Sequence, residues 1–110
     1  MSSLLAALKA HEILLANAAS NVANMNTEGY RSLRATITSS HGGEPTVVIS
    51  RDKASNNAIG VQTEPSGVDL AREFSDLIVS QRGYEAILAA ISCREDMFHD
   101  LMSIINGKNE

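Results

Sequence analysis

The sequence predicts a mainly α protein in which two terminal helices form an antiparallel, coiled-coil-like hairpin with a small β-rich insert between them. Apolar residues recur at alternating spacings of three and four in residues 2–25 and again in residues 68–105. This spacing keeps one stripe of a helix facing a partner helix. Between the two stretches, apolar and polar residues alternate, as expected for half-buried strands. We therefore interpret the chain as a single structural unit composed of residues 1–30, 31–65 and 66–110.

The first predicted helix, residues 2–25, carries two different stripes. Asparagine is a poor helix former, so three asparagines on one face call for an explanation. They either form a solvated face near a fraying helix end or set the register between packed helices, as buried polar residues do in coiled coils. The helix should end near Asn26, before a turn in which Gly29 is available for positive φ. The apolar stripe consists of Met1, Leu4, Leu8, His11, Leu15, Ala18, Val22 and Met25, and the amide stripe of Asn17, Asn21 and Asn24.

The insert, residues 31–65, changes to the period of a β-strand. Apolar and polar residues alternate at positions 33–37, which predicts a first strand. A loop with two consecutive glycines leads to a second, β-branched strand at 46–50, and residues 59–63 are compatible with a third. Strands this short form a marginal sheet unless they dock on the helices.

The second predicted helix, residues 68–105, is much longer than the first. Pro65 cannot continue a helix from upstream, and Ser66 can cap the new helix with Asp69 three residues later. At 1.5 Å per residue the two helices span roughly 57 and 37 Å, so roughly 20 Å of the long stripe should stay uncovered in a monomeric hairpin. The stripe consists of Phe74, Leu77, Gln81, Tyr84, Leu88, Ile91, Glu95, Phe98, Met102 and Ile105.

An uncovered apolar stripe favours association, because each Å² removed from water contributes about 25 cal/mol. The expectation is therefore self-assembly, or assembly with related proteins. Gln81 and Glu95 either reach water at the edge of the stripe or set its register, since an unpaired buried polar group costs about 1–3 kcal/mol. Gly83 is interpreted as a weak point, costing about 1 kcal/mol relative to alanine.

The composition argues against several classes of function. The chain of 110 residues has a net charge of −4, and residues 66–110 carry eight acids against four bases. An acidic long helix disfavours binding to nucleic acid or an anionic membrane, and no apolar run approaches the length of a membrane span. Cys93 is the single cysteine, so no intramolecular disulfide can form. The N-terminus lacks the basic region of a cleaved signal peptide.

The sequence offers no set of residues for catalysis. His11, His41 and His99 lie far apart in the sequence and are interpreted as structural or solvated rather than as metal ligands. Cys93 has no His and Asn partner pattern and is interpreted as a packing residue. We therefore expect a protein that is not an enzyme and that has no catalytic residues, no metal site and no cofactor.

Two stretches at opposite ends of the chain form a recognisable pattern. The first is Asn21-Val22-Ala23-Asn24-Met25-Asn26-Thr27-Glu28-Gly29-Tyr30-Arg31, and the second is Val68-Asp69, Glu73-Phe74, Ile78, Gln81-Arg82 and Tyr84-Glu85-Ala86. Both resemble the bacterial flagellar axial proteins of the rod and hook. The first is similar to that family's amide-rich helix end followed by Asn-x-x-Thr-Pro-Gly-Tyr, and the second is similar to the family's terminal helix. The chain departs from the pattern at Glu28, Gly67 and Ile87, and its short insert resembles the small proximal rod subunits.

The resemblance implies a structural subunit of the flagellar basal-body rod. It implies that the terminal helices pack with other copies and with related rod and hook proteins into a tubular shaft, which crosses the periplasm and transmits torque. It also implies export through the flagellar type III apparatus without a cleaved signal, with no nucleic acid bound and no membrane insertion. The expected interface residues are Leu8, Leu15, Asn17, Asn21, Val22, Asn24, Phe74, Leu77, Tyr84, Leu88, Ile91 and Phe98.

Two other functions compete with this one. A soluble helical-hairpin adaptor would use the same stripe to bind a foreign amphipathic helix, and would fold alone and bind one partner stoichiometrically. A small hydrolase or metal enzyme would need a pocket with convergent titratable groups, which the sequence does not indicate.

Overall fold

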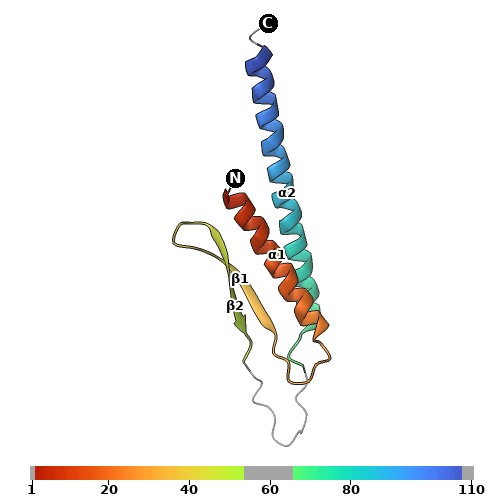
Figure 1. The fold of residues 1–110 in the computed structure, drawn as a ribbon. Helices are drawn as coiled ribbons and strands as arrows, with labels where there is room; N and C mark the ends of the chain where they lie inside the picture. Colours follow the sequence, from red (N-terminus) through yellow and green to blue (C-terminus); the bar gives the residue numbers. More distant parts are fainter. Residues whose placement is uncertain (1, 54–65, 108–110) are drawn as a thin grey trace, which may run out of the picture.

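A computed structural model describes residues 2–53 and 66–107. The elements in chain order are helix α1 (Ser2–Ala23), strands β1 (Leu33–Ser39) and β2 (Pro45–Arg51), and helix α2 (Leu70–Gly107). Figure 1 shows that α1 and α2 run side by side in opposite directions, with the hairpin of β1 and β2 lying along α1. The predicted fold class, two terminal helices with a small β-rich insert, is confirmed. The possible third strand at 59–63 lies outside the described residues.

The turn after α1 follows the sequence prediction closely. The helix ends at Ala23, two residues earlier than expected, and the amide of Asn24 donates to the carbonyls of Ser20 and Asn21 in a final tight turn. Gly29 has φ of +70°, a conformation that L side chains rarely adopt. The prediction of a positive φ at Gly29 is therefore confirmed.

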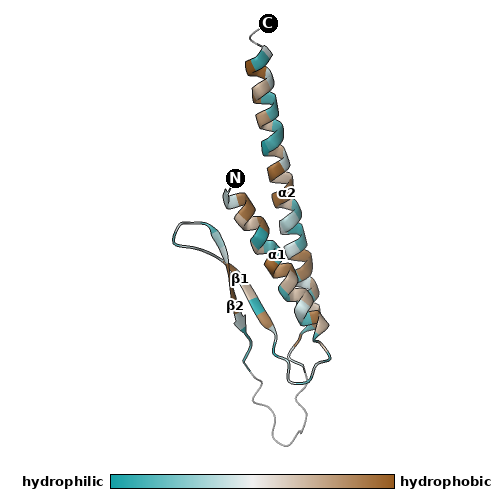
Figure 2. Ribbon diagram, in the orientation of Figure 1, coloured by the Kyte–Doolittle hydropathy of each residue, from teal (hydrophilic) through white to brown (hydrophobic). Residues whose placement is uncertain are grey.

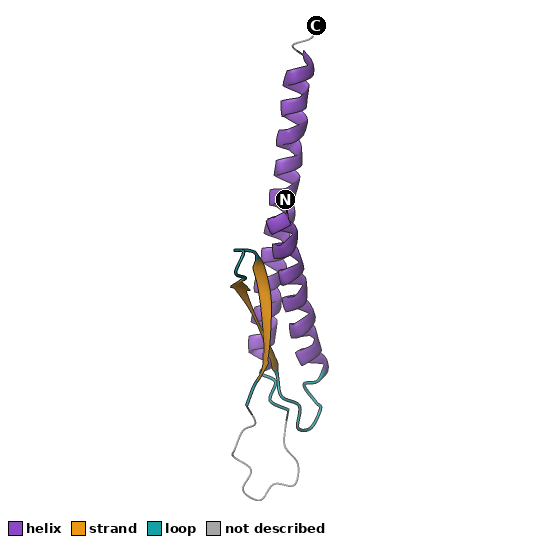
Figure 3. Cartoon of the chain, turned by 60° about the vertical axis from the view of Figure 1, so that its left-hand side comes forward, coloured by secondary structure: helices purple, strands orange, loops and turns teal. Residues whose placement is uncertain are grey.

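The hairpin, drawn in orange in Figure 3, has a regular antiparallel register that runs from the pair Leu33 and Arg51 to the pair Ser39 and Pro45. Below the turn, the amide of Ser40 donates to the carbonyl of Glu44 at 2.8 Å. Because bonded and non-bonded pairs alternate along such a ladder, Pro45 occupies a position whose missing N–H removes no ladder bond.

The N-terminus of α2 is capped by a different residue from the one predicted. The amide of Arg72 donates to the Asp69 carboxylate at 3.3 Å, and the first helical bond runs from the amide of Glu73 to the carbonyl of Asp69 at 3.0 Å. Asp69 is thus the N-cap. The prediction of Ser66 was wrong, because the Ser66 hydroxyl donates instead to the backbone carbonyl of Asn24 at 3.0 Å.

The described part of the chain has a very small apolar core. Its buried apolar residues are Ala10 and Ala18, whereas its other buried residues are polar. Every residue from 92 to 107 is exposed, which leaves about 24 Å of α2 without cover, close to the length expected from the sequence. None of the described helices combines the length and apolar character needed to cross a membrane. The buried polar residues are Asn21, Ser32, Glu73 and Ser80.

Candidate assembly surface

The face of α2 that packs against α1 matches the predicted stripe only in part. At several positions the inward residue is the one just before the predicted residue. Leu77, Tyr84 and Ile91 lie half-buried as expected. Phe74, Leu88 and Phe98, however, are 50%, 44% and 59% exposed. We call the residues that face inward the inner stripe; their spacings again alternate between four and three. The inner stripe consists of Glu73, Leu77, Ser80, Tyr84, Ile87 and Ile91.

The predicted interface residues of α1 are less exposed than those of α2. Leu8, Leu15 and Val22 are all half-buried in the single chain. They therefore contribute first to the folding of this chain, and only their remaining surface is open to a neighbour. That these residues contact neighbouring subunits stays a prediction.

Gly83 of α2 lies directly against His11 of α1. A Cβ atom on Gly83 would overlap the imidazole of His11, at 2.7 Å from Nδ1 and 3.0 Å from Nε2. With the His11 ring in this position there is no room for a side chain at residue 83, so a larger residue would require the ring to move. Nδ1 of His11 is buried and has no hydrogen-bond partner among the described residues.

The amide stripe of α1 holds the first strand in place. Oδ1 of Asn21 accepts from the backbone amide of Leu33 at 2.9 Å and from the Tyr30 hydroxyl at 3.0 Å. Its Nδ2 donates to the Leu33 carbonyl at 2.8 Å, and Nδ2 of Asn17 donates to the same oxygen at 2.9 Å. The Asn21 amide thus pairs with Leu33 much as a neighbouring strand would. These amides fix a strand on a helix within one chain, a role that neither sequence interpretation included.

Asn24 has a more local role. Its Nδ2 donates to the carbonyl of Ser20 at 2.8 Å, and its Oδ1 accepts from the Thr27 hydroxyl at 3.2 Å. These bonds close the end of α1. Whether any of the three asparagines also contacts another subunit remains a prediction.

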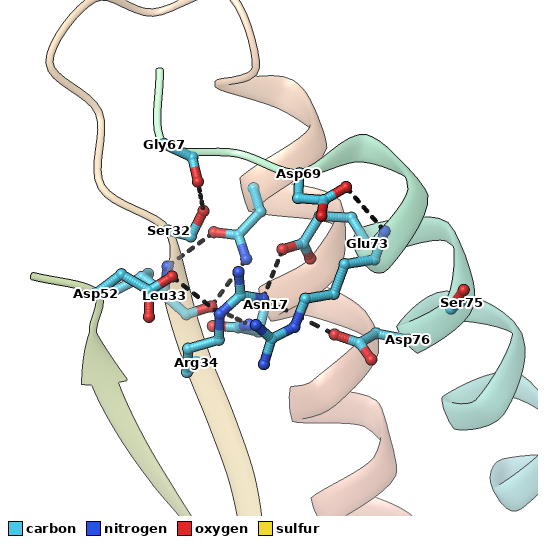
Figure 4. A network of polar contacts seen from close by, with 12 residues as sticks. Asn17, Ser32, Leu33, Arg34, Asp52, Gly67, Asp69, Glu73, Ser75 and Asp76 are labelled. Atoms are coloured by element: carbon cyan, nitrogen blue, oxygen red, sulfur yellow. Dashed lines mark hydrogen bonds and ion pairs between the residues drawn. The ribbon is translucent and has the colours of Figure 1, made fainter. Parts of the chain in front are cut away.

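A charged cluster joins the hairpin to the start of α2 (Figure 4). Arg34, on β1, donates from Nη1 to Glu73 at 2.8 Å and from Nε to Asp52 at 3.0 Å. A third carboxylate, on Asp76, lies 3.9 Å from Nη1. Glu73 is fully buried, and its Oε2 has no partner in the described residues. Burial alone would lower the pKa of Arg34, but the charges of Asp52 and Glu73 and their hydrogen bonds outweigh it and raise that pKa.

Backbone bonds complete this junction. The amide of Gly67 donates to the carbonyl of Tyr30 at 2.8 Å, and the Ser32 hydroxyl donates to the carbonyl of Gly67 at 2.9 Å. A Cβ on Gly67 would lie 3.3 Å from the Tyr30 oxygen, so little room remains there. The segment before β1 is therefore bonded both to α1 and to the chain entering α2.

A groove lies between β1 and α2, with α1 as its floor. Its cavity volume is about 210 Å³, below the roughly 300–1,000 Å³ of small-molecule sites. Leu14 and Ala18 of α1 and Val79 of α2 supply apolar surface, and Asn17, Arg34, Thr36, Arg72, Asp76 and Ser80 supply polar groups. In the described residues, no three His, Cys, Asp or Glu side chains gather into a metal-binding group.

The free end of α2 is the second prominent surface. Figure 2 shows hydrophobic and hydrophilic residues alternating along this end, beyond the reach of α1. We call its apolar residues the tip stripe; each of them is more than half exposed. The tip stripe consists of Met97, Phe98, Leu101, Met102, Ile104 and Ile105.

Two family profiles match the chain. Residues 1–31 match the profile described as flagella basal body rod protein, and residues 62–104 match the profile described as flagellar basal body rod FlgEFG protein C-terminal. The two matches follow one another in the chain and together cover about two thirds of it.

The chain belongs to the flagellar basal body rod protein family.

The recognition made from the sequence is thereby confirmed. No curated protein matches the chain. The rod family is structural and not enzymatic, and membership implies assembly with other axial proteins of the flagellum.

The rod-family matches overlap the two helices, and both strands of the hairpin lie between the matches in the sequence. Sequence reasoning missed Arg34 and Glu73 as partners, because 39 positions separate them. One signal in the sequence could have placed Glu73 on the inward face of α2. It lies four residues before Leu77 and follows the same alternating spacing as Tyr84 and Ile91. For His11 and Gly83, no pattern in the sequence indicated that they face one another.

Proposed function

We propose that this rod-family chain is a structural subunit of the bacterial flagellar basal-body rod, whose terminal helices pack with those of neighbouring axial subunits into the torque-transmitting shaft. The observation that carries the proposal is the uncovered end of α2, where residues 92–107 are all exposed. Six large apolar side chains on that end are 53–65% exposed. An apolar helix surface of this kind marks a site of protein association.

The outward residues Phe74, Leu88 and Phe98 are the predicted interface residues with the most surface to offer a neighbour. Leu77, Tyr84 and Ile91, like the predicted apolar residues of α1, are already half-buried against the chain itself. In the proposed shaft, the first three would make the contacts between subunits and the others would keep each subunit's hairpin of helices intact.

The junction around Arg34 supports a mechanical role. It joins β1, the residue after β2 and the first turn of α2 through bonds of 2.8–3.0 Å. Because Arg34 and Glu73 are largely withdrawn from water, this connection is screened less by salt than a surface ion pair. A subunit that must pass torque along a shaft gains from such a connection between its insert and its helices.

The remaining parts of the proposal concern place and partners. The rod position implies other copies and related rod and hook proteins as neighbours. It also implies passage through the flagellar type III export apparatus without a cleaved signal, to a basal body that crosses the periplasm. The resemblance of both terminal segments to the axial family supports these steps.

The test is replacement of the native gene by a Phe98→Asp variant in a motile host. Phe98 is 59% exposed on the uncovered end of α2, so the variant should be exported normally but be missing from isolated basal bodies, with motility lost. Ser103→Asp, on the opposite side of the same helix end, is the matched control and should be incorporated. Normal motility and incorporation of the Phe98→Asp variant would contradict the proposal.

Phe74→Asp extends the same test to the covered half of α2. Phe74 is half exposed, so the charge should disturb contacts between subunits more than the fold. Loss of incorporation with intact export is the expected result. An adaptor, by contrast, would be found outside basal bodies, bound to one partner in a fixed ratio.

A further inference from the structure

Two surfaces at opposite ends of α2 have complementary shapes. The groove beside Val79 is concave and is lined by both apolar and polar residues, whereas the tip stripe is a convex, apolar helix surface. Val79 and Phe98 are 19 residues apart on one continuous helix, which places them about 28 Å apart. A chain therefore cannot fill its own groove with its own tip.

The groove has the capacity to accept a large apolar side chain. Its volume of about 210 Å³ is too small for most cofactors but suits one protruding residue, in the way a knob enters a hole between packed helices. Val79 on its wall is 68% exposed. The groove thus keeps apolar surface that the single chain leaves uncovered.

The tip stripe is unusually broad. At about 100° per residue, its six members cover an arc of about 160°, wider than the arc of about 100° with which a typical surface helix faces its core. Glu95 and Asp100 flank the stripe on its two sides. Such a face has room both to enter a groove and to contact a second neighbour.

The groove offers an unpaired base to an acidic tip. Its charged lining residues are Arg34, Arg72 and Asp76, and Arg34 is already bound by Asp52 and Glu73. Residues 92–107 carry one base and three acids, a net charge of −2. At the groove, Arg72 is exposed and forms no ion pair with any described residue. Complementary charge of this kind selects one docking arrangement over others.

We infer that the groove between β1 and α2 of one copy receives the tip stripe of a second copy of this chain, with Phe98 as the residue that enters. The inference deepens the proposed function and rests on it for its biological setting. The arrangement joins two different surfaces, so each added copy leaves one groove and one tip free. Such head-to-tail contacts generate open assemblies when the rotation between copies does not close a ring.

The test uses two variants of the full chain and their mixture. Val79→Asp places a charge in the groove, and Phe98→Asp places one on the tip. Both side chains are largely exposed, so neither change should disturb the fold, which circular dichroism checks. Wild-type chain should grow beyond dimers with rising concentration in sedimentation velocity. Each variant alone should associate at least about tenfold more weakly, the loss typical of a central interface residue.

The mixture gives the deciding result. The Val79→Asp chain keeps a working tip and the Phe98→Asp chain keeps a working groove, so an equimolar mixture should form a 1:1 dimer that does not grow further. Ile78→Asp and Ser103→Asp, close to the two sites but outside groove and stripe, should associate like wild type.

Several results would overturn the inference. They are a wild-type chain that stays monomeric at millimolar concentration, a Val79→Asp chain that associates normally, a mixture without the dimer, or controls that fail as the variants do. A wild-type monomer that binds only another rod protein through the tip would show that the occupant is not a second copy. Failure of the proposed function is distinguishable, because a chain absent from basal bodies could still form the head-to-tail contact in solution.

Discussion

The two halves of α2 belong to one continuous helix but are built for different neighbours. From Leu70 to Ile91 the inward positions include a carboxylate, a serine and a tyrosine, and Gly83 lies directly beneath His11. From residue 92 to 107 every position is exposed, and six large apolar side chains form the tip stripe. The half of α2 that packs against α1 therefore has the more polar contact face. The free half of α2 has the more apolar face, the tip stripe.

This difference separates the stability of the single chain from the drive to assemble. The covered half of α2 is held by specific polar bonds and by the close approach of its residues to α1. Both kinds of contact require one defined arrangement of the helices and strands. The free half supplies general apolar surface, whose contribution scales with area and does not depend on direction. Substitutions in the two halves should accordingly change different measurements: unfolding for the first, association for the second.

The largest expected effect on unfolding is at Arg34. Arg34→Ala leaves the carboxylate of Glu73 buried with no counter-charge, and breaking a buried pair in this way costs about 3–5 kcal/mol. Urea unfolding at a concentration where the chain is monomeric measures it. Arg82→Ala removes an exposed pair with Glu85 and should change the free energy of unfolding by at most about 1 kcal/mol. Equal effects of the two substitutions would contradict the distinction between buried and exposed pairs.

Gly83→Ala gives a smaller effect whose sign is informative. Helix propensity alone predicts a gain of about 1 kcal/mol, whereas overlap with His11 predicts a loss of about 1–3 kcal/mol. We expect the loss, measured by thermal and urea unfolding. In a His11→Ala background the ring is gone, and Gly83→Ala should then stabilise the protein. A gain in the wild-type background would show that the helices can separate at little cost.

Sequence periodicity predicted both helices, the hairpin and the length of uncovered helix, because each depends on local spacing and on residue counts. It did not predict which face of α2 turns inward. The apolar residues Phe74 and Leu88 fit a stripe at least as well as Glu73 and Ile87 do. The choice was made by contacts from elsewhere in the chain, namely Arg34 at Glu73 and His11 at Gly83, and spacing along one helix carries no information about these.

The asparagines show the same limit of prediction from sequence patterns. Their shared face was visible in the sequence, and a structural reason for it was expected. The partner, however, is the backbone of Leu33, which has no side-chain signature that a sequence pattern can report. The assembly surfaces divide in the same way: the tip stripe follows from helix spacing, whereas the groove exists only once three elements are folded together.

The smallest effect on unfolding, and the sharpest contrast between the two halves, is expected for Leu101→Ala. Leu101 is 58% exposed and lies beyond the reach of α1, so the free energy of unfolding of the monomer should change by at most about 0.5 kcal/mol. Association should nevertheless weaken measurably. Hydrogen exchange gives the matching picture: amides in residues 92–104 should exchange rapidly in the monomer, because no tertiary packing supports that end, and slowly in the assembled state. A monomer in which both halves of α2 are equally protected would mean that the free end is stable by itself, and the division proposed between folding and assembly would then be wrong.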